Sequence, residues 1–291
     1  MRKFIFLSVL SVLCWGQVAS DQPFTGAETA ALAGAVEANP ASAASLFHNP
    51  AGLSELQHPF ITVTTADYFG VNHMALGGFL RTKCGIPMGI TIQQSNVDLS
   101  GITLSEETAV GISSAIDLQH DVNSRLILGT RVNYYHWSLG RTAGVSGDGS
   151  DGFPSESGTS YGIDLGIMAT LRDKHRLGAT LTNLNSPSIG EGNGQQNLPR
   201  RLSIATAYAP YHGLVTSLVL ERVMGRDDIQ IQGGFRYDLN DWFTLRLGVQ
   251  SKPNRLGAGF GLVWNHLMLD YGLLTHPVLP EMHHFSVGYS F

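Results

Sequence analysis

Short segments in which apolar side chains alternate with small or polar ones run through most of this chain. In the clearest, Phe243, Leu245, Leu247 and Val249 alternate with Thr244, Arg246, Gly248 and Gln250. This period-two pattern predicts strands with one apolar face toward lipid and one small or polar face toward a lumen, as in a transmembrane antiparallel β-barrel. We predict fourteen strands, near residues 59–70, 72–82, 85–97, 106–118, 124–139, 159–172, 175–185, 200–210, 213–224, 228–238, 242–251, 255–264, 267–276 and 283–291.

The connections between these segments alternate in length. If the first strand runs outward, short inner turns fall at residues 82–84, 119–123, 173–174, 211–212, 239–241 and 265–266, and longer outer loops include 98–105, 140–158 and 185–199. Short periplasmic turns and longer outer loops are typical of outer-membrane barrels, and an even number of strands places both barrel ends on one side. The pattern favours fourteen strands but leaves twelve open.

Composition excludes two other classes of protein. Charged residues make up 14% of the chain, and the formal net charge of −5 becomes −7 without Arg2 and Lys3, so nucleic acid is not an expected partner. After the leader, no run approaches the roughly 18 apolar residues that a spanning helix needs. Membrane lipid is the expected surrounding, with an aromatic belt at the strand ends formed by Tyr68, Phe69, Trp137, Tyr208, Trp242 and Trp264.

Residues 1–20 have the three parts of a signal peptide. Arg2 and Lys3 precede an apolar core at residues 4–15, and small residues precede a cleavage site after Ser20. We therefore expect export and location in the cell outer membrane. Cleavage there leaves Cys84 as the single cysteine, so no intrachain disulfide, metal site or cofactor is predicted.

Residues 21–58 separate the leader from the barrel of residues 59–291, and they predict a plug, or hatch, in the lumen. The segment is rich in Ala and Ser, whose small side chains allow close packing, and Asn49, Pro50 and Gly52 favour a tight turn. The Ala-rich stretch between Glu28 and Glu37 predicts one or two short helices. A fourteen-stranded barrel has room for such a filling.

An Ala-rich segment, then Asn49-Pro50-Ala51-Gly52-Leu53, then alternating strands that end on Phe291, resembles the superfamily of FadL fatty-acid channels and PorV-type proteins of type IX secretion. The resemblance implies a hatch that a hydrophobic small molecule, such as a long-chain fatty acid, must pass. The chain is much shorter than FadL, and its size resembles the PorV-like members, which implies the alternative of secretion-system subunits as partners. The residues expected to contact ligand at the hatch are Phe47, Asn49, Pro50, Ala51, Gly52 and Leu53.

Five charged residues fall on the predicted inward face: Arg131, Asp164, Arg236, Arg246 and Asp270. Inward placement is favoured because a charge facing lipid at the midplane costs roughly 2–4 kcal/mol. The arginines could grip a carboxylate headgroup, or they could pair with the acids and hold the hatch. The sequence leaves both roles open.

The third predicted strand contains Gly85, Pro87 and Gly89, which predict a kink or bulge because Pro cannot donate to the ladder and Gly weakens it. FadL-like channels release ligand sideways through a kinked third strand, so the resemblance implies a lateral opening near Met88. The alternative is a bulge at the periplasmic rim. No enzyme is predicted, because Ser138 and His136 lack an evident third catalytic partner.

Overall fold

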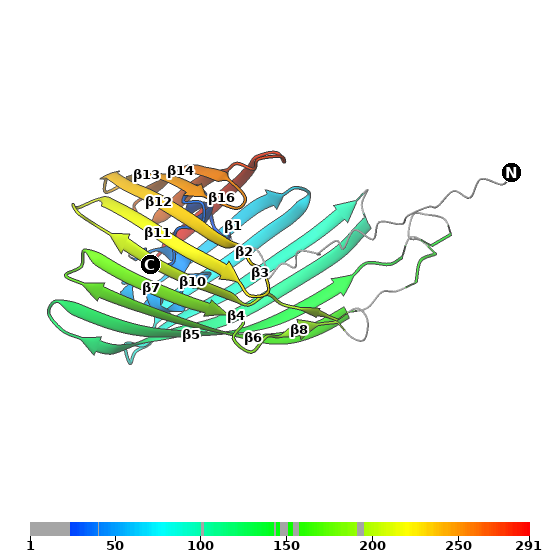
Figure 1. Cartoon of the computed structure of the whole chain (residues 1–291), viewed down its shortest axis with the longest axis horizontal. Coiled ribbons are helices and arrows are strands. Elements are labelled where there is room, and N and C mark those ends of the chain that lie inside the picture. The colour runs from blue at the N-terminus through cyan, green and yellow to red at the C-terminus, as the bar shows by residue number, and fades with distance from the viewer. Residues whose placement is uncertain are drawn as a thin grey trace.

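The computed structural model describes residues 24–39, 41–99, 102–142, 144–145, 151–153, 157–190 and 195–291, and the expected leader at residues 1–20 lies outside these ranges. Fourteen strands close into an antiparallel barrel, as predicted (Figure 1). These strands are β1 (Phe60–Tyr68), β2 (Val71–Arg81), β3 (Pro87–Leu99), β4 (Ile102–His120), β5 (Ser124–Leu139), β6 (Ser157–Leu171), β7 (His175–Thr182), β10 (Arg201–Tyr208), β11 (Leu214–Val223), β12 (Ile229–Asn240), β13 (Phe243–Gln250), β14 (Arg255–Trp264), β15 (Leu267–Leu274) and β16 (Met282–Ser290).

The barrel closes where its first strand pairs with its last. Phe60 of β1 lies opposite Ser290 of β16, and the pairing continues to Ala66 and His284. Strand β7 pairs directly with β10, because β8 (Ser188–Ile189) and β9 (Gln196–Asn197) form a separate small sheet in the intervening loop. Within the described residues, each of the fourteen strands therefore has a paired neighbour on both sides, which is the condition for a sheet to exist in lipid.

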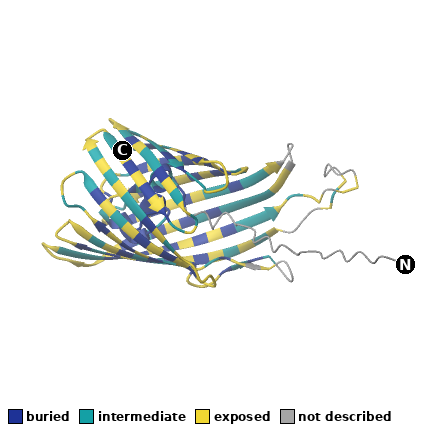
Figure 2. Cartoon of the chain, turned by 45° about the horizontal axis from the view of Figure 1, so that its top comes forward, coloured by how far each residue is buried: buried dark blue, intermediate teal, exposed yellow. Residues whose placement is uncertain are grey.

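The two faces of the wall differ as the alternation predicts. On β1, every second residue from Phe60 to Tyr68 is buried, whereas Ile61 and Val63 are 48% and 42% exposed. The same banding of buried and exposed residues runs around the barrel (Figure 2). Two residues expected in the aromatic belt instead face inward: the Tyr68 hydroxyl donates to the carbonyl of Phe24, and Trp137 packs against an internal cluster that includes Tyr135.

The barrel has one end with short connections, here called the short-turn end, and an opposite long-loop end. The short-turn end carries the turns at residues 82–86, 121–123, 172–174, 209–213, 241–242 and 265–266, together with the C-terminus. Strands β3 to β6 project beyond their neighbours at the long-loop end (Figure 1). The loop expected at residues 98–105 is therefore mostly strand, since β3 continues to Leu99 and β4 starts at Ile102.

Residues 24–39 and 41–56, here called the hatch, lie inside the barrel. They contain one short α-helix, α1 (Ala27–Ala31), and two 3₁₀ helices, η2 (Ala43–Leu46) and η3 (Pro50–Glu55). Helix α1 ends early because Ala33 and Gly34 adopt positive φ values of 48° and 90°. No helix within the described ranges has the length and apolar character needed to cross a bilayer.

Glycines on the inner wall let the hatch backbone lie directly against the strands. A Cβ at Gly248 of β13 would overlap the backbone of Leu32 and Ala33, and one at Gly257 of β14 would lie 2.5 Å from the carbonyl oxygen of Ala30. Gly272 on β15 meets the backbone of Ala27 in the same way. Helix α1 therefore packs where the wall has no side chains.

We expect Gly248→Ala to displace the hatch without preventing barrel formation, because its methyl group would overlap backbone at a cost of about 1–3 kcal/mol. Limited proteolysis of the folded barrel should cleave the variant hatch faster than that of the unmodified protein. Gly233→Ala is the matched control, since its Cβ would face lipid and meet only Val249 Cγ2, at 3.3 Å. Equal cleavage rates for both variants would contradict the tight fit.

Candidate functional site

One half of the hatch is fixed against strands β4 to β6. Helix η3 begins at Pro50 and packs on Gly129 of β5, whose missing side chain makes room for the backbone of Pro50 and Ala51. Around it, Leu46 and Leu53 are fully buried with Ile127 in the largest apolar cluster of the hatch and wall. This part is held by apolar burial and by hydrogen bonds from the wall, such as those of Arg81 and Arg125 to the carbonyl oxygen of Ser54.

Asn49 fixes the start of this half. Its Oδ1 accepts from the backbone N–H of Ala51 at 3.0 Å and so caps η3, while Pro50 takes the first helical position. Its Nδ2 donates to the carbonyl oxygens of Glu37 at 2.9 Å and Ile167 at 3.3 Å. Because Asn49 is 2% exposed, it joins two parts of the hatch to the wall and presents no surface to a ligand.

A second part of the hatch, which follows the α1 region packed on β13 to β15, crosses the lumen at residues 34–38 and is here called segment 34–38. It contacts the opposite wall through few polar bonds: Thr180 Oγ1 donates to Glu37 Oε2 at 2.7 Å, and Ser217 Oγ donates to the Ala35 carbonyl at 2.8 Å. Ala38 lies beside Gly178, and a Cβ added to Gly178 would lie 3.3 Å from the Cβ of Ala38. Segment 34–38 therefore meets this part of the wall through small side chains and a few hydrogen bonds.

Segment 34–38 separates two spaces. On its long-loop side is the luminal cavity, of about 70 Å³, and on its short-turn side is the mouth recess, of about 570 Å³. Strands β7, β11 and β12 each contribute inward residues to the cavity, to the contact with the segment and to the recess. From cavity to recess these residues run Thr182, Thr180, Gly178 and Arg176 on β7; Glu221, Val219, Ser217 and Val215 on β11; and Gln232, Gly234 and Arg236 on β12.

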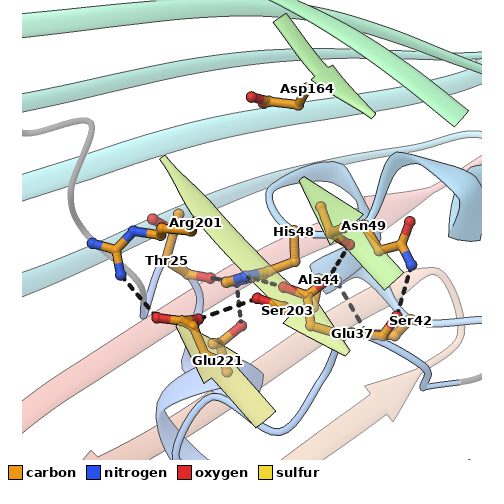
Figure 3. A network of polar contacts seen from close by, with 12 residues as sticks. Thr25, Glu37, Ser42, Ala44, His48, Asn49, Asp164, Arg201, Ser203 and Glu221 are labelled. Carbon is orange, nitrogen blue, oxygen red and sulfur yellow. Dashed lines mark hydrogen bonds and ion pairs between the residues drawn. The ribbon is translucent and has the colours of Figure 1, made fainter. Parts of the chain in front are cut away.

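The luminal cavity is polar. Glu221 accepts from Arg201 Nη1 at 2.9 Å and from Ser203 Oγ at 3.4 Å, and Figure 3 shows this group across from His48 and Glu37 of the hatch. Phe47 also lines the cavity, whereas Pro50, Ala51, Gly52 and Leu53 are buried and do not. Of the expected hatch contacts, only Phe47 therefore reaches this space.

Burial dominates the electrostatics of Glu37 and His48. Desolvation raises the pKa of Glu37 to about 7, although the Thr180 hydrogen bond and Arg131 oppose the rise and Glu221 and Asp164 add to it. Burial, with the charge of Arg131, lowers the pKa of His48 to about 4. His48 Nδ1 lies 3.8 Å from Glu37 Oε1, and between these two pKa values both side chains are mainly uncharged.

The five expected luminal charges form separate pairs. Arg131 Nε donates to Asp164 Oδ2 at 2.8 Å, and its Nη1 donates to the Leu46 carbonyl of the hatch at 2.9 Å. Arg246 Nη1 donates to Asp270 Oδ1 at 2.6 Å, and Arg236 pairs with Asp238 instead of the other two acids. Each arginine thus has a carboxylate partner, and Arg131 also holds the hatch.

The bulge expected at Gly85, Pro87 and Gly89 is not present. Pro87 is the first residue of β3, where no ladder donor is needed, and its pairing with β2 runs without a shift from Arg81–Pro87 to Val71–Val97. The register with β4 shifts only between Val97 and Asp98, at the long-loop end. Gly85 lies in the preceding turn with φ of 81°.

Gly89 has a different role from the one expected. A Cβ there would lie 2.7 Å from Leu46 Cδ2 and 3.3 Å from Leu53 Cδ1, so Gly89 makes room for hatch side chains. The wall at this position is continuous, and Met88 faces outward with 38% exposure. The pairing of β3 therefore shows no lateral opening.

Residues 38–258 match the model of a protein family described as "F plasmid transfer operon, TraF, protein". That stretch is well over half of the chain. The chain belongs to this family. No curated protein matches it by sequence.

Several solved structures similar to this TraF-family barrel are channels of the FadL type, as the sequence predicted. The monoaromatic hydrocarbon channel CymD has a TM-score of 0.64 at 13% identity, over 91% of this chain and 97% of its own. The Ralstonia pickettii toluene transporter TbuX has a TM-score of 0.61 at 13% identity, over 91% of this chain and 98% of its own. A Pseudomonas aeruginosa FadL homologue has a TM-score of 0.58 at 12% identity, over 92% of this chain and 98% of its own.

At these identities the likeness shows the fold, which is that of outer-membrane channels of Gram-negative bacteria. The resemblance to PorV-type proteins receives no support from these matches. The TraF-family barrel also has site residues that the sequence analysis missed, namely Glu37, His48, Arg201 and Glu221. The alternation could have marked Glu221 as inward, but its partner Arg201 depends on the register between β10 and β11.

Replacing Asn49 tests how segment 34–38 is held. We expect Asn49→Ala to loosen this segment, since it removes a buried donor to Glu37 and the cap of η3, at a cost of about 1–2 kcal/mol. The amide hydrogens of residues 35–38 should exchange faster with solvent. Asn39→Ala is the control, because the buried Asn39 amide has no partner within the described residues; equal acceleration in both variants would be inconsistent with this role.

The raised pKa of Glu37 predicts that any opening of the hatch depends on pH. An open hatch returns Glu37 to water, where its pKa is 4.5, so closure is favoured at low pH and weakens as pH rises from 4.5 to 7, by an amount on the order of 1–3 kcal/mol. In an Ala38→Cys variant, thiol labelling at residue 38, expressed relative to exposed Cys84, should be faster at pH 8 than at pH 5.5. Glu37→Gln should abolish this difference, and a persistent difference would exclude Glu37 as its source.

Proposed function

We propose that this TraF-family protein is an outer-membrane channel that passes a small hydrophobic molecule along the β7–β10–β11–β12 wall. The observation that carries the proposal is the pair of spaces on either side of segment 34–38, along one part of the wall. The similar solved structures are described as hydrocarbon channels and toluene transporters, which supports this class of cargo. They are channels and not enzymes, and we propose no catalytic activity.

The direction of passage follows from the two ends. Short turns of outer-membrane barrels face the periplasm, so the long-loop end faces outward and the short-turn end inward. A molecule then enters the luminal cavity first and reaches the mouth recess after passing segment 34–38. Where the route passes segment 34–38, the wall includes small residues such as Ala205, Ala207 and Gly178.

The hatch must move for passage to occur. Ligand pockets commonly have volumes of about 300–1,000 Å³, whereas the luminal cavity has about 70 Å³, which is room for only a few waters. Segment 34–38 is the part that we expect to move. The contacts of η3 bury several large apolar side chains, each of which stabilises by roughly 1.5–3 kcal/mol, whereas each hydrogen bond of segment 34–38 contributes about 0.5–1.5 kcal/mol.

A disulfide between the hatch and the wall tests this movement. Cβ atoms at Ala38 and Gly178 would be 3.3 Å apart, close to the roughly 3.5–4.5 Å of a disulfide. In a Cys84→Ser background, the oxidised Ala38→Cys/Gly178→Cys variant should lose uptake of radiolabelled toluene and decanoate into proteoliposomes, and reduction should restore it. Gly178→Cys alone is the essential control, because its Cβ would also lie 2.8 Å from the carbonyl oxygen of Glu37 and would shift segment 34–38 without any disulfide. Ala38→Cys alone controls for the second thiol.

Uptake that is equal in the oxidised and reduced states would show that segment 34–38 does not open. The family description names a plasmid transfer operon, so the alternative is a subunit of a transfer or secretion complex. Purification in mild detergent separates the two functions. A small hydrophobic molecule found by mass spectrometry supports the channel, whereas a stoichiometric protein partner together with absence of uptake supports the complex.

A further inference from the structure

We propose that the mouth recess is a binding site for an amphipathic anion, with an apolar body and a carboxylate or phosphate end. This deepens the proposed function, because it names the chemistry of the molecule held on the inner side of the hatch. The recess lies inside the short-turn end, between the hatch at Ala41 and the turns at residues 172–174 and 209–213. At about 570 Å³ it has the volume of a small-molecule site.

The body of the recess is apolar. Ala209, Pro210, Leu214 and Val215 line it from β11 and the turn before it, and Ala41 lines it from the hatch. Val215 is buried in a cluster that continues along the wall to Ala207 and Ala38. A hydrocarbon chain in this space exchanges water for apolar neighbours, which is favourable in proportion to the area buried.

The rim of the recess is cationic, although the chain as a whole carries a net negative charge. Four cationic side chains, Arg172, Lys174, Arg176 and Arg236, line the recess against the two carboxylates of Asp173 and Asp238. Arg236 is held by Asp238, with nitrogen to oxygen distances of 3.0 and 3.2 Å.

Arg172 and Lys174 form no ion pair with a carboxylate within the described part of the chain. They stand on one short turn at the edge of the apolar space, as a headgroup site requires. The exposed ring of Tyr211 flanks the opening, at 77% exposure. An anionic end at the turn and an apolar body against β11 satisfy both parts of the recess.

Arg176 connects this site to the hatch. Its Nε lies 3.4 Å from Glu55 Oε1 at the end of η3, and its Nη1 donates to the Asp173 carbonyl at 3.2 Å. No hydrogen bond from Nη2 forms within the described residues, so this nitrogen is available to an anion in the recess. An anion there shares Arg176 with Glu55 and therefore weakens one attachment of the hatch to the wall.

The probe for this site is a decanoate that carries a diazirine on its alkyl chain, and the matched probe is the same molecule with an alcohol in place of the carboxylate. Both are photolysed with the full-length folded barrel in dodecyl maltoside, and the labelled residues are mapped by mass spectrometry. The carboxylate should label residues 209–215 saturably, and the alcohol about tenfold less efficiently. Arg172→Gln/Lys174→Gln should reduce carboxylate labelling about tenfold, since two rim charges are lost.

Lys83→Gln is the control variant, because Lys83 is an exposed cation on another turn of the same end and does not line the recess. Its labelling should equal that of the unmodified protein. Raising NaCl from 20 to 500 mM should weaken labelling by the carboxylate and leave the alcohol unchanged, which tests the charge without any variant. Equal labelling by both probes, or no effect of the double variant, would overturn the site.

The outcomes separate this site from the channel function. Carboxylate labelling of the recess in a protein that takes up neither toluene nor decanoate supports the anion site and contradicts the channel. Normal uptake without selective labelling supports the channel and overturns the anion site. Inorganic phosphate serves as a competitor of the photoreactive decanoate. If it reduces labelling as effectively as unlabelled decanoate does, the amphipathic character of the ligand is also overturned.

Discussion

The arrangement of this protein depends on direct contact between the hatch backbone and the inner wall. The contact requires glycine at inward positions, as at Gly129, Gly248 and Gly272, because a Cβ there would overlap hatch backbone. Successive strand residues face opposite sides, so an inward glycine leaves the lipid-facing neighbours free to be large and apolar. The barrel can therefore be filled by a chain segment while its outer face remains suited to a bilayer.

The hatch is attached unequally to the two sides of the barrel. Its η3 half buries Leu46, Leu53 and neighbouring apolar groups against β4 to β6, and Arg131 fixes the Leu46 carbonyl. Segment 34–38 faces the other wall with alanines and a few hydrogen bonds. This difference in energy makes it reasonable that one half anchors the hatch while the other opens, so that a channel need not expel the whole segment.

Charge is distributed along the lumen in a way that suits this division. Around the luminal cavity the acids and arginines are paired with each other, and the hatch groups Glu37 and His48 are mainly uncharged at mildly acidic pH. At the short-turn end, Arg172 and Lys174 stand free of carboxylates among the described residues. Two cations without carboxylate partners, beside an apolar recess, can hold an anionic end with little desolvation of existing pairs.

The sequence by itself determined the fourteen strands, their two faces and the short connections, because a period-two pattern is written in consecutive residues. The sequence analysis wrongly placed Tyr68 and Trp137 in the aromatic belt, because the face on which a side chain lies at a strand end depends on strand pairing. It also wrongly predicted a bulge at Pro87, because the residue at which a strand starts depends on pairing as well. Only the tertiary structure decided which charges meet, that Asn49 holds Glu37 instead of facing a ligand, and where the cavity and recess lie. The Thr180–Glu37 bond joins residues 143 positions apart, and such contacts are fixed by barrel register and hatch docking, which no local pattern encodes.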